Sequence, residues 1–260
     1  MAYKAFDLTG KVALVTGGNG GIGLGMADAV AQAGADVCIW GTNETKNKAA
    51  VEQLKAHGTR VSSLLCNVSD ESEVKDCFAE TLSQYGRVDG CFANAGVSSG
   101  KKSFLDIDDA EWHRVLNINL DGVFYTFQAA TRHMVERAKA GDPGGRLVGT
   151  ASLAAISGAA RNEHYAATKG GVISMIRALA VEYAKYEITA NAILPGWIET
   201  AMTENAMNWQ KFSDAVKPRI PARRWGKPED FGGQAVYIMS DASSYHTGDT
   251  FLIDGGYFLF

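Results

Sequence analysis

Near its start the chain reads Lys11-Val-Ala-Leu-Val-Thr-Gly-Gly-Asn-Gly-Gly-Ile-Gly23, a short apolar run followed by a glycine-rich turn. The run predicts a buried strand, and the apolar spacing of residues 26–33 predicts a helix directly after the turn. Glycines permit unusual backbone angles and close approach of a ligand, while the free N–H groups at a helix start favour an anion. The turn can be read as Gly18-x-Gly20-x-x-Gly23 or as Gly17-x-x-x-Gly21-x-Gly23. Strand, turn and helix together predict a pyrophosphate site of a dinucleotide rather than a merely structural turn.

A second strand, residues 36–40, completes the first β-α-β unit. Dinucleotide folds often place an acidic residue at this point to bind the adenosine ribose hydroxyls. Here the chain reads Gly41-Thr42-Asn43, with neither a carboxylate to repel a 2′-phosphate nor an arginine to bind one. Lys46 could supply a charge, although a solvated surface lysine is commoner. NAD and NADP therefore both remain possible.

Strands and helices alternate through the rest of the chain. Further strands are predicted at residues 60–66, 88–93, 146–151, 188–194 and 250–253, and helices at 44–57, from a Ser69 cap, from Asp108 to near Ala140, at 163–185 and at 228–240. Residues 197–225 are the longest stretch without clear periodicity. The pattern predicts one α/β domain over residues 1–260. We expect a Rossmann-like, doubly wound and predominantly parallel seven-stranded sheet with helices on both faces.

Composition excludes several function classes. The net charge of −4 with mixed signs argues against a nucleic-acid partner, and no apolar run is long enough to cross a bilayer. The four cysteines form no Cys-x-x-Cys pair and the five histidines show no ligand spacing, so we expect free thiols and no metal. Residues 1–7 hold no apolar signal core. These features favour a cytoplasmic location.

A candidate proton-transfer pair lies in the predicted helix at 163–185. Tyr165 and Lys169 are four residues apart and share one helix face. An ammonium beside a phenol favours the phenolate, so a group with a pKa of about 10 can act as an acid or base near neutrality. The pattern also occurs by chance on exposed helices, and its meaning depends on the rest of the chain.

Seven short motifs occur in one order along nearly the whole chain: Thr16-Gly-x-x-x-Gly-Ile-Gly23, Asn94-Ala-Gly96, Asn119 within Asn119-Leu-x-Gly-Val-Phe, Ser152, Tyr165-x-x-x-Lys169, Pro195-Gly196 with Thr200, and Asp254-Gly-Gly256. Each motif is weak alone. In this order and spacing they resemble the short-chain dehydrogenase/reductase family of the single-domain kind.

The resemblance implies an NAD(P)-dependent oxidoreductase that interconverts a secondary alcohol and a ketone. Tyr165 would exchange a proton with the substrate oxygen while hydride moves to or from the nicotinamide. Lys169 would lower the phenol pKa and bind the nicotinamide ribose. Ser152 would hold the substrate oxygen, and Asn119 would anchor a water that links Lys169 to solvent.

The resemblance also assigns cofactor contacts. They are Gly17, Asn19, Gly21, Ile22 and Gly23 at the phosphates; Thr42 at the adenosine ribose; Asn67 and Val68 around adenine; Asn94, Ala95 and Gly96 along the channel; Tyr165 and Lys169 at the nicotinamide ribose; and Pro195, Gly196, Ile198 and Thr200 near the carboxamide. Asn67 stands where aspartate is usual, and its amide oxygen is expected to accept from an amino group. Ala93 replaces a frequent second asparagine.

The expected substrate wall is apolar and aromatic. Besides Ser152 and Tyr165, it draws on Leu153, Ala154, His164, Trp197, Met202, Met207, Trp209 and Phe212. This wall favours a medium-sized alicyclic or aromatic alcohol or ketone. We expect residues 197–225 to form a mobile lid over the site. His164 either touches substrate or is a satisfied surface histidine.

Two further expectations concern the class of protein and its assembly. A nicotinamide-sensing binding protein on the same fold is the alternative, but such a protein would be expected to have lost part of the catalytic set. The family suggests a homotetramer, or a homodimer, with the apolar tail Tyr257-Phe-Leu-Phe260 at a subunit interface or buried within its own chain.

Overall fold

The computed structural model describes residues 3–260 and contains one seven-stranded sheet, in which every neighbouring pair of strands is parallel. The strand order is β3-β2-β1-β4-β5-β6-β7. The strands are β1 (Val12–Thr16), β2 (Asp36–Gly41), β3 (Val61–Leu65), β4 (Gly90–Ala93), β5 (Gly145–Thr150), β6 (Ile188–Pro195) and β7 (Thr250–Ile253). The order reverses between β1 and β4, as expected for a doubly wound sheet. The predicted strands and fold class are confirmed.

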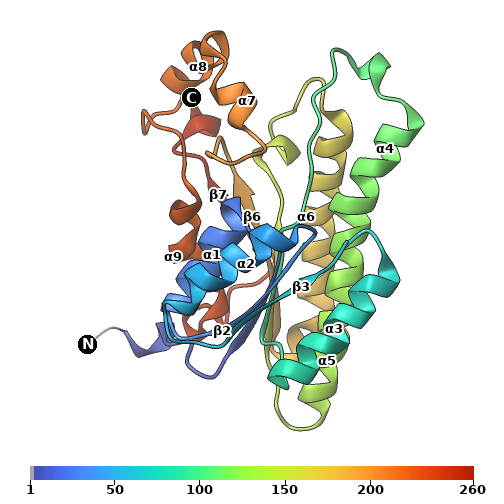
Figure 1. Ribbon diagram of the computed structural model, residues 1–260, viewed down its shortest axis with the longest axis vertical. Helices are drawn as coiled ribbons and strands as arrows, with labels where there is room; N and C mark the ends of the chain where they lie inside the picture. Colours follow the sequence, from blue (N-terminus) through green and yellow to red (C-terminus); the bar gives the residue numbers. More distant parts are fainter. Residues whose placement is uncertain (1–2) are drawn as a thin grey trace.

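Helices cover both faces of the sheet (Figure 1). The main helices are α1 (Gly21–Gln32), α2 (Glu44–Lys55), α3 (Glu71–Tyr85), α4 (Asp109–Leu116), α5 (Gly122–Lys139), α6 (Glu163–Tyr183) and α9 (Gly232–Met239). Figure 1 shows α1, α2 and α9 on one side, and α3, α5 and α6 on the other. Such double cover is why the strands are near-continuous apolar runs.

The core alternates with strand period two. Val12 and Leu14 pack into the cluster that includes Phe127 of α5, while Ala13 and Val15 pack into the cluster that includes Met26 of α1. Successive side chains of a strand point to opposite faces, so β1 joins two separate apolar layers. Burial of β1 on both sides fixes the position of the glycine turn that follows it.

Two predicted helix details are wrong. The cap of α3 is Asp70, not Ser69, because the Asp70 carboxylate accepts from the backbone N–H groups of Ser72 and Glu73. The helix expected from Asp108 to near Ala140 is two helices, α4 and α5, joined by a π-helical turn, η3 (Asn117–Asp121). Asp108 does cap α4 as expected, since it accepts from the N–H of Glu111.

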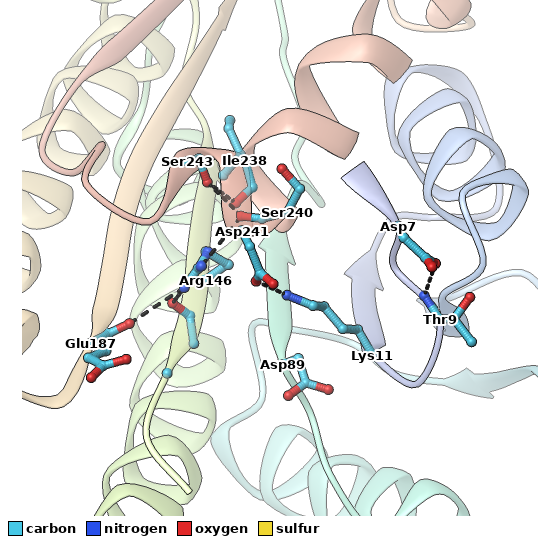
Figure 2. Close-up of polar contacts among 12 residues, drawn as sticks. Asp7, Thr9, Lys11, Asp89, Arg146, Glu187, Ile238, Ser240, Asp241 and Ser243 are labelled. Carbon is cyan, nitrogen blue, oxygen red and sulfur yellow. Dashed lines mark hydrogen bonds and ion pairs between the residues drawn. The ribbon is translucent and has the colours of Figure 1, made fainter. Parts of the chain in front are cut away.

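A network of polar side chains lies at the amino edge of the sheet, and part of it is drawn in Figure 2. Asp89 accepts from the backbone N–H of Val12 at 2.9 Å and from the guanidinium groups of Arg87 and Arg137. Arg146 donates to the carbonyl oxygens of Gly145, Glu187 and Ser240, and Lys11 pairs with Asp241. These contacts satisfy strand-end and helix-end groups at this edge.

Residues 197–225 hold two short helices, α7 (Glu204–Met207) and α8 (Gln210–Val216), beyond the carboxyl edge of the sheet (Figure 1). Within this segment Phe212 packs edge-on against Trp197, with ring centroids 4.9 Å apart, and stacks with Trp225 at 6.5 Å. The segment thus has its own small apolar cluster. None of the helices described in residues 3–260 is long and apolar enough to cross a membrane.

Candidate active site

A cavity of about 430 Å³ opens at the carboxyl edge of the sheet, where the order of the strands reverses. Ligands of open α/β sheets bind at such an edge. The predicted site residues that line it are Gly17, Asn19, Gly21, Ile22, Thr42, Asn67, Val68, Asn94, Ala95, Gly96, Ser152, Tyr165, Lys169, Pro195, Gly196, Ile198, Thr200 and Met202. One cavity therefore brings together residues from the glycine turn and from the Ser152 and Tyr165 region, which are more than 120 residues apart in sequence.

The glycine turn is shaped for close approach. Gly17 and Gly21 have φ angles of 64° and 52°, which residues other than glycine rarely adopt. A Cβ atom at Gly23 would lie 2.4 Å from Asn94 Nδ2, and one at Gly18 would lie 2.6 Å from Ile39 Cγ2. At Gly20 a Cβ would meet no atom within 4 Å. The turn is packed from behind and open in front, directly before the N-terminus of α1, and this fits the phosphates of a dinucleotide.

Asn94 ties the ends of three strands together. Its Nδ2 donates to Thr16 O at 3.1 Å, and its Oδ1 accepts from Thr150 Oγ1 at 3.2 Å. In return, Thr16 Oγ1 accepts from the backbone N–H groups of Asn94 and Ala95, both at 3.0 Å. Because these contacts link β1, β4 and β5, they hold the glycine turn in register with the strand that leads to Ser152.

The cavity end that adjoins β2 and β3 holds Thr42, Lys46, Asn67 and Val68. The Asn67 amide oxygen accepts from Ser69 N at 3.2 Å and from Ser69 Oγ at 2.8 Å. In the structure both of its lone pairs are therefore used within the loop. The side-chain oxygen of Asn43 caps α2 by accepting from Lys46 N.

At the other end Lys169 is buried, and its Nζ donates to Thr150 O at 2.7 Å. Nζ lies 5.6 Å from the centre of the Tyr165 ring. Burial lowers the pKa of Lys169 to about 8. Burial also raises the pKa of Tyr165, and a hydrogen bond with Ser152 opposes this rise. In the structure, desolvation of Tyr165 therefore outweighs the lowering of its pKa by the Ser152 hydrogen bond.

Asn119 lies in the π-helical turn and is fully buried. Its Oδ1 accepts from Val97 N and its Nδ2 donates to Val97 O, both at 2.8 Å. A Cβ atom at Gly96 would lie 3.2 Å from Asn119 Oδ1 and 3.4 Å from Lys169 Nζ. The asparagine therefore fixes the backbone after β4 beside the lysine.

Comparison with known proteins agrees with this geometry. The family model described as enoyl-(acyl carrier protein) reductase matches residues 17–258. The chain belongs to the short-chain dehydrogenase/reductase family. The resemblance noted from the motifs is confirmed.

This short-chain dehydrogenase/reductase matches relatives over nearly its full length. It is 36% identical over 257 residues to 2-dehydro-3-deoxy-D-gluconate 5-dehydrogenase of Dickeya dadantii, with 99% of both chains covered. A short-chain type dehydrogenase/reductase from Mycobacterium marinum gives a TM-score of 0.91 at 34% identity, with 98% of both chains covered. A gluconate 5-dehydrogenase from Burkholderia cenocepacia, solved with NADP and tartrate, gives 0.93 at 31% identity, with 100% of both covered. As a member of this family the protein is an NAD(P)-dependent oxidoreductase.

Five predicted site residues lie outside the cavity lining found in residues 3–260: Gly23, Asn119, Leu153, His164 and Trp197. Gly23 and Asn119 support the lining from behind, through Asn94 and Val97. Leu153 and His164 are buried, and Trp197 packs in the α8 cluster. Met207 and Phe212 also belong to that cluster, and Trp209 is exposed. Of the eight residues expected in the substrate wall besides Ser152 and Tyr165, the structure brings only Met202 to the cavity.

Several lining residues were absent from the predicted site. They are Gly20, Trp40, Gly41, Lys46, Cys66, Val97, Ile118, Thr150, Ala151, Ala201 and Thr203. Most of them flank a predicted residue at a strand end, so adjacency to the carboxyl edge is the signal that could have found them. No group of three or more His, Cys, Asp or Glu side chains within residues 3–260 is arranged to hold a metal ion.

Proposed function

We propose that this enzyme interconverts a secondary alcohol and a ketone, with Tyr165 as the proton donor and acceptor. The observation that carries the proposal is that Ser152, Tyr165 and Lys169 line the same cavity as the glycine turn. A nicotinamide cofactor held by that turn would supply or accept the hydride. Substrate oxygen and cofactor would then meet at one end of a single cleft.

The roles of the three polar side chains follow from their surroundings. Tyr165 is protonated at neutral pH, since a phenol has a pKa of about 10 and burial raises the pKa of Tyr165 further, so it can donate a proton to the oxygen of a ketone. Ser152 would donate a hydrogen bond to the same oxygen as charge develops there. Lys169, with a pKa of about 8, is mostly an ammonium at pH 7 and would stabilise the phenolate left after proton transfer.

For the substrate we propose a medium-sized alicyclic or aromatic ketone. Apolar Val97, Ile198, Ala201 and Met202 in the lining support this class. A sugar or sugar acid is the second candidate, and the gluconate-type relatives favour it. The hydroxyl groups of Ser152, Thr200 and Thr203 in the lining could bind such a polyol.

The test begins with titration of the purified protein with NADH and with NADPH, followed by cofactor fluorescence. Cyclic and aromatic ketones and keto sugar acids are then added to the complex that forms. Oxidation of cofactor by either group supports an alcohol/ketone oxidoreductase and identifies the substrate class. Cofactor binding with no turnover on any member of the panel would favour a nicotinamide-sensing protein instead.

Tyr165→Phe is the decisive variant. It removes only the transferable proton, so we expect turnover to fall by about 10² to 10⁴-fold. Cofactor affinity should stay within about twofold of the unmodified protein. Tyr183→Phe, on the same helix but outside the cavity lining, is the matched control. Turnover near the original level in Tyr165→Phe would contradict the proposed mechanism.

A further inference from the structure

His164 directly precedes Tyr165 on α6 and is completely buried. Its Nε2 lies 3.3 Å from Ser99 Oγ and 3.6 Å from Glu111 Oε1. Its Nδ1 has no hydrogen-bond partner among the described residues. Neither the cofactor site nor the proton-transfer set uses this histidine, although it adjoins the reacting tyrosine. A buried polar ring in that place needs a physical account.

The contacts assign a direction to the hydrogen bonds. Ser99 Oγ donates to Glu111 Oε1, because an ionised carboxylate only accepts. With its hydrogen used there, Ser99 Oγ can only accept from His164, so Nε2 carries the ring proton. Nδ1 is then left as a lone pair, and no N–H is buried without an acceptor. These hydrogen bonds run from His164 Nε2 through Ser99 to Glu111.

Glu111 accepts the last of these hydrogen bonds and is itself held in place. Arg114 donates to both of its carboxylate oxygens, with Nε and Nη2 at 2.8 Å, and holds the pKa of Glu111 down to about 2. Such a two-point contact sets the orientation of the carboxylate as well as its charge. Since Glu111 and Arg114 both belong to α4, His164 connects α6 to α4 through Ser99.

The intervening segment, residues 97–101, borders the cavity through Val97. Asn119 holds Val97 on one side. On the other side Ser98 Oγ accepts from Asn162 Nδ2 at 2.7 Å, and Lys101 N donates to Arg161 O at 3.1 Å. The 97–101 segment is therefore tied to the residues that precede α6 and, through His164, to its first turn.

We propose that His164 is a positioning residue for the proton transfer. It holds the first turn of α6, and with it Tyr165, at a fixed place relative to the cavity wall at residues 97–101. Neighbouring helix residues point about 100° apart, so His164 can face this segment while Tyr165 faces the cavity. The inference rests on the proposed function, in which Tyr165 must meet a substrate oxygen held against that wall.

The variants separate hydrogen bonding from packing. His164→Leu introduces an apolar side chain of similar bulk and removes the N–H donor. We expect kcat to fall about tenfold with cofactor affinity unchanged, because small misplacements of reacting groups slow the reaction strongly. His164→Gln places an amide N–H near the position of Nε2, and should restore kcat to within about threefold of the original. Ser99→Ala should match His164→Leu. The double variant should lose no more than either single one, since both remove the same link.

His113→Leu is the control, because His113 is exposed on α4 and pairs with Asp109. A readout that needs no turnover is the ring NMR signal of Tyr165, identified by its loss in Tyr165→Phe. It should shift in His164→Leu and Ser99→Ala, and stay in place in His164→Gln and His113→Leu. In the unmodified protein, ¹⁵N spectra of His164 should show the proton on Nε2.

The outcomes distinguish the two proposals. An unmodified protein that turns over no ketone contradicts the proposed function, and the NMR shifts still decide whether His164 positions Tyr165. Normal turnover in His164→Leu, equal losses in the Leu and Gln variants, or additive losses with Ser99→Ala each overturn the positioning role. A lowered melting temperature shared by the Leu and Gln variants, with kcat unchanged, would assign His164 to stability alone.

Discussion

Lys169 is 3% exposed, and its ammonium has one backbone oxygen, Thr150 O, at 2.7 Å. Removal from water disfavours the charged form, which is why the pKa falls to about 8. In the same place the phenol of Tyr165 has its pKa raised. Both shifts favour the uncharged forms. A cofactor ribose or a substrate oxygen bound between them would add the polar contacts that burial has removed.

This burial predicts the pH dependence of ketone reduction. Lys169 is charged below its pKa and neutral above it, so kcat should fall as pH rises through about 8. Lys169→Arg keeps a positive charge at every accessible pH, and should lose this alkaline decline even though its kcat is lower. Steady-state rates from pH 6 to 10 measure both profiles. An identical decline in the arginine variant would assign the titration to another group.

Sequence identified the proposed proton-transfer pair because its chemistry depends on local spacing. Tyr165 and Lys169 are one helical turn apart wherever the helix packs, and both do line the cavity. His164 was uncertain because its role depends on Ser99 and Glu111, which are distant in sequence. Trp197 was expected in the wall but packs with Phe212 instead. No periodic pattern tells which of two apolar clusters an aromatic side chain will join.

Among the helices and strands, sequence patterns located nearly all elements and missed one feature of register. One continuous helix was expected from Asp108 to near Ala140, because Asp108 and Glu111 look like the capping pair of a long helix. The π-helical turn at Asn117–Asp121 leaves no such signature, since an extra residue in one turn only shifts the phase of the pattern. That turn is what places Asn119 beside Val97.

The contacts of Asp89, which connect β1, β4 and α5 at the amino edge, should stabilise the folded protein measurably. Asp89 has a buried side chain that accepts from Val12 N, Arg87 and Arg137. We expect Asp89→Asn to lower the free energy of unfolding by about 3 kcal/mol, the lower end of the range for a broken buried pair, because Arg87 is partly solvated. Urea unfolding measures it, with Asp109→Asn as the exposed control. Equal effects in the two variants would mean that the network is not stabilising.

Residues 197–225 are proposed to form a lid that becomes ordered when cofactor binds. Met202 lines the cavity, and α7 and α8 pack around their own small cluster. Bound cofactor should therefore slow tryptic cleavage after Lys211 and Arg219 by about tenfold, because cleavage needs local opening. Lys75 on α3 is the internal control site. Unchanged cleavage within 197–225 would count against a lid.

At the scale of the molecule, the two edges of the sheet do different work. The carboxyl edge holds the cavity that contains the predicted site residues. The amino edge carries the ion pair of Asp89 with Arg137 and that of Lys11 with Asp241, the second of which is drawn in Figure 2. Along the sheet, β1 to β3 supply the glycine turn and Thr42, and β4 to β6 lead to Gly96, Ser152 and Pro195. The half of the sheet that carries the glycine turn and the half that leads to Ser152 pair along β1 and β4, where Asn94 links them.

The exposed apolar residues at the C-terminus predict how the protein assembles. Phe258, Leu259 and Phe260 at the C-terminus are all exposed in the single chain, and a run of exposed apolar residues is typical of an interface. We expect a homotetramer, or a homodimer, in which this tail is covered by another subunit. Leu259→Asp with Phe260→Asp should then yield smaller species by analytical ultracentrifugation. Tyr245→Asp, at another fully exposed residue, should leave the assembly intact. A monomer in the unmodified protein would refute the expectation.

The π-helical turn also limits which changes of chain length this protein can tolerate. Deleting one residue between Asn117 and Asp121 would restore an ordinary helix, a change that is locally favourable. The same deletion would rotate α4 about 100° and shift it about 1.5 Å relative to α5. Glu111 would then face away from Ser99, and Asn119 from Val97. Substitutions on the outer side of this turn should therefore be tolerated. Single-residue deletions should abolish activity but leave the protein folded.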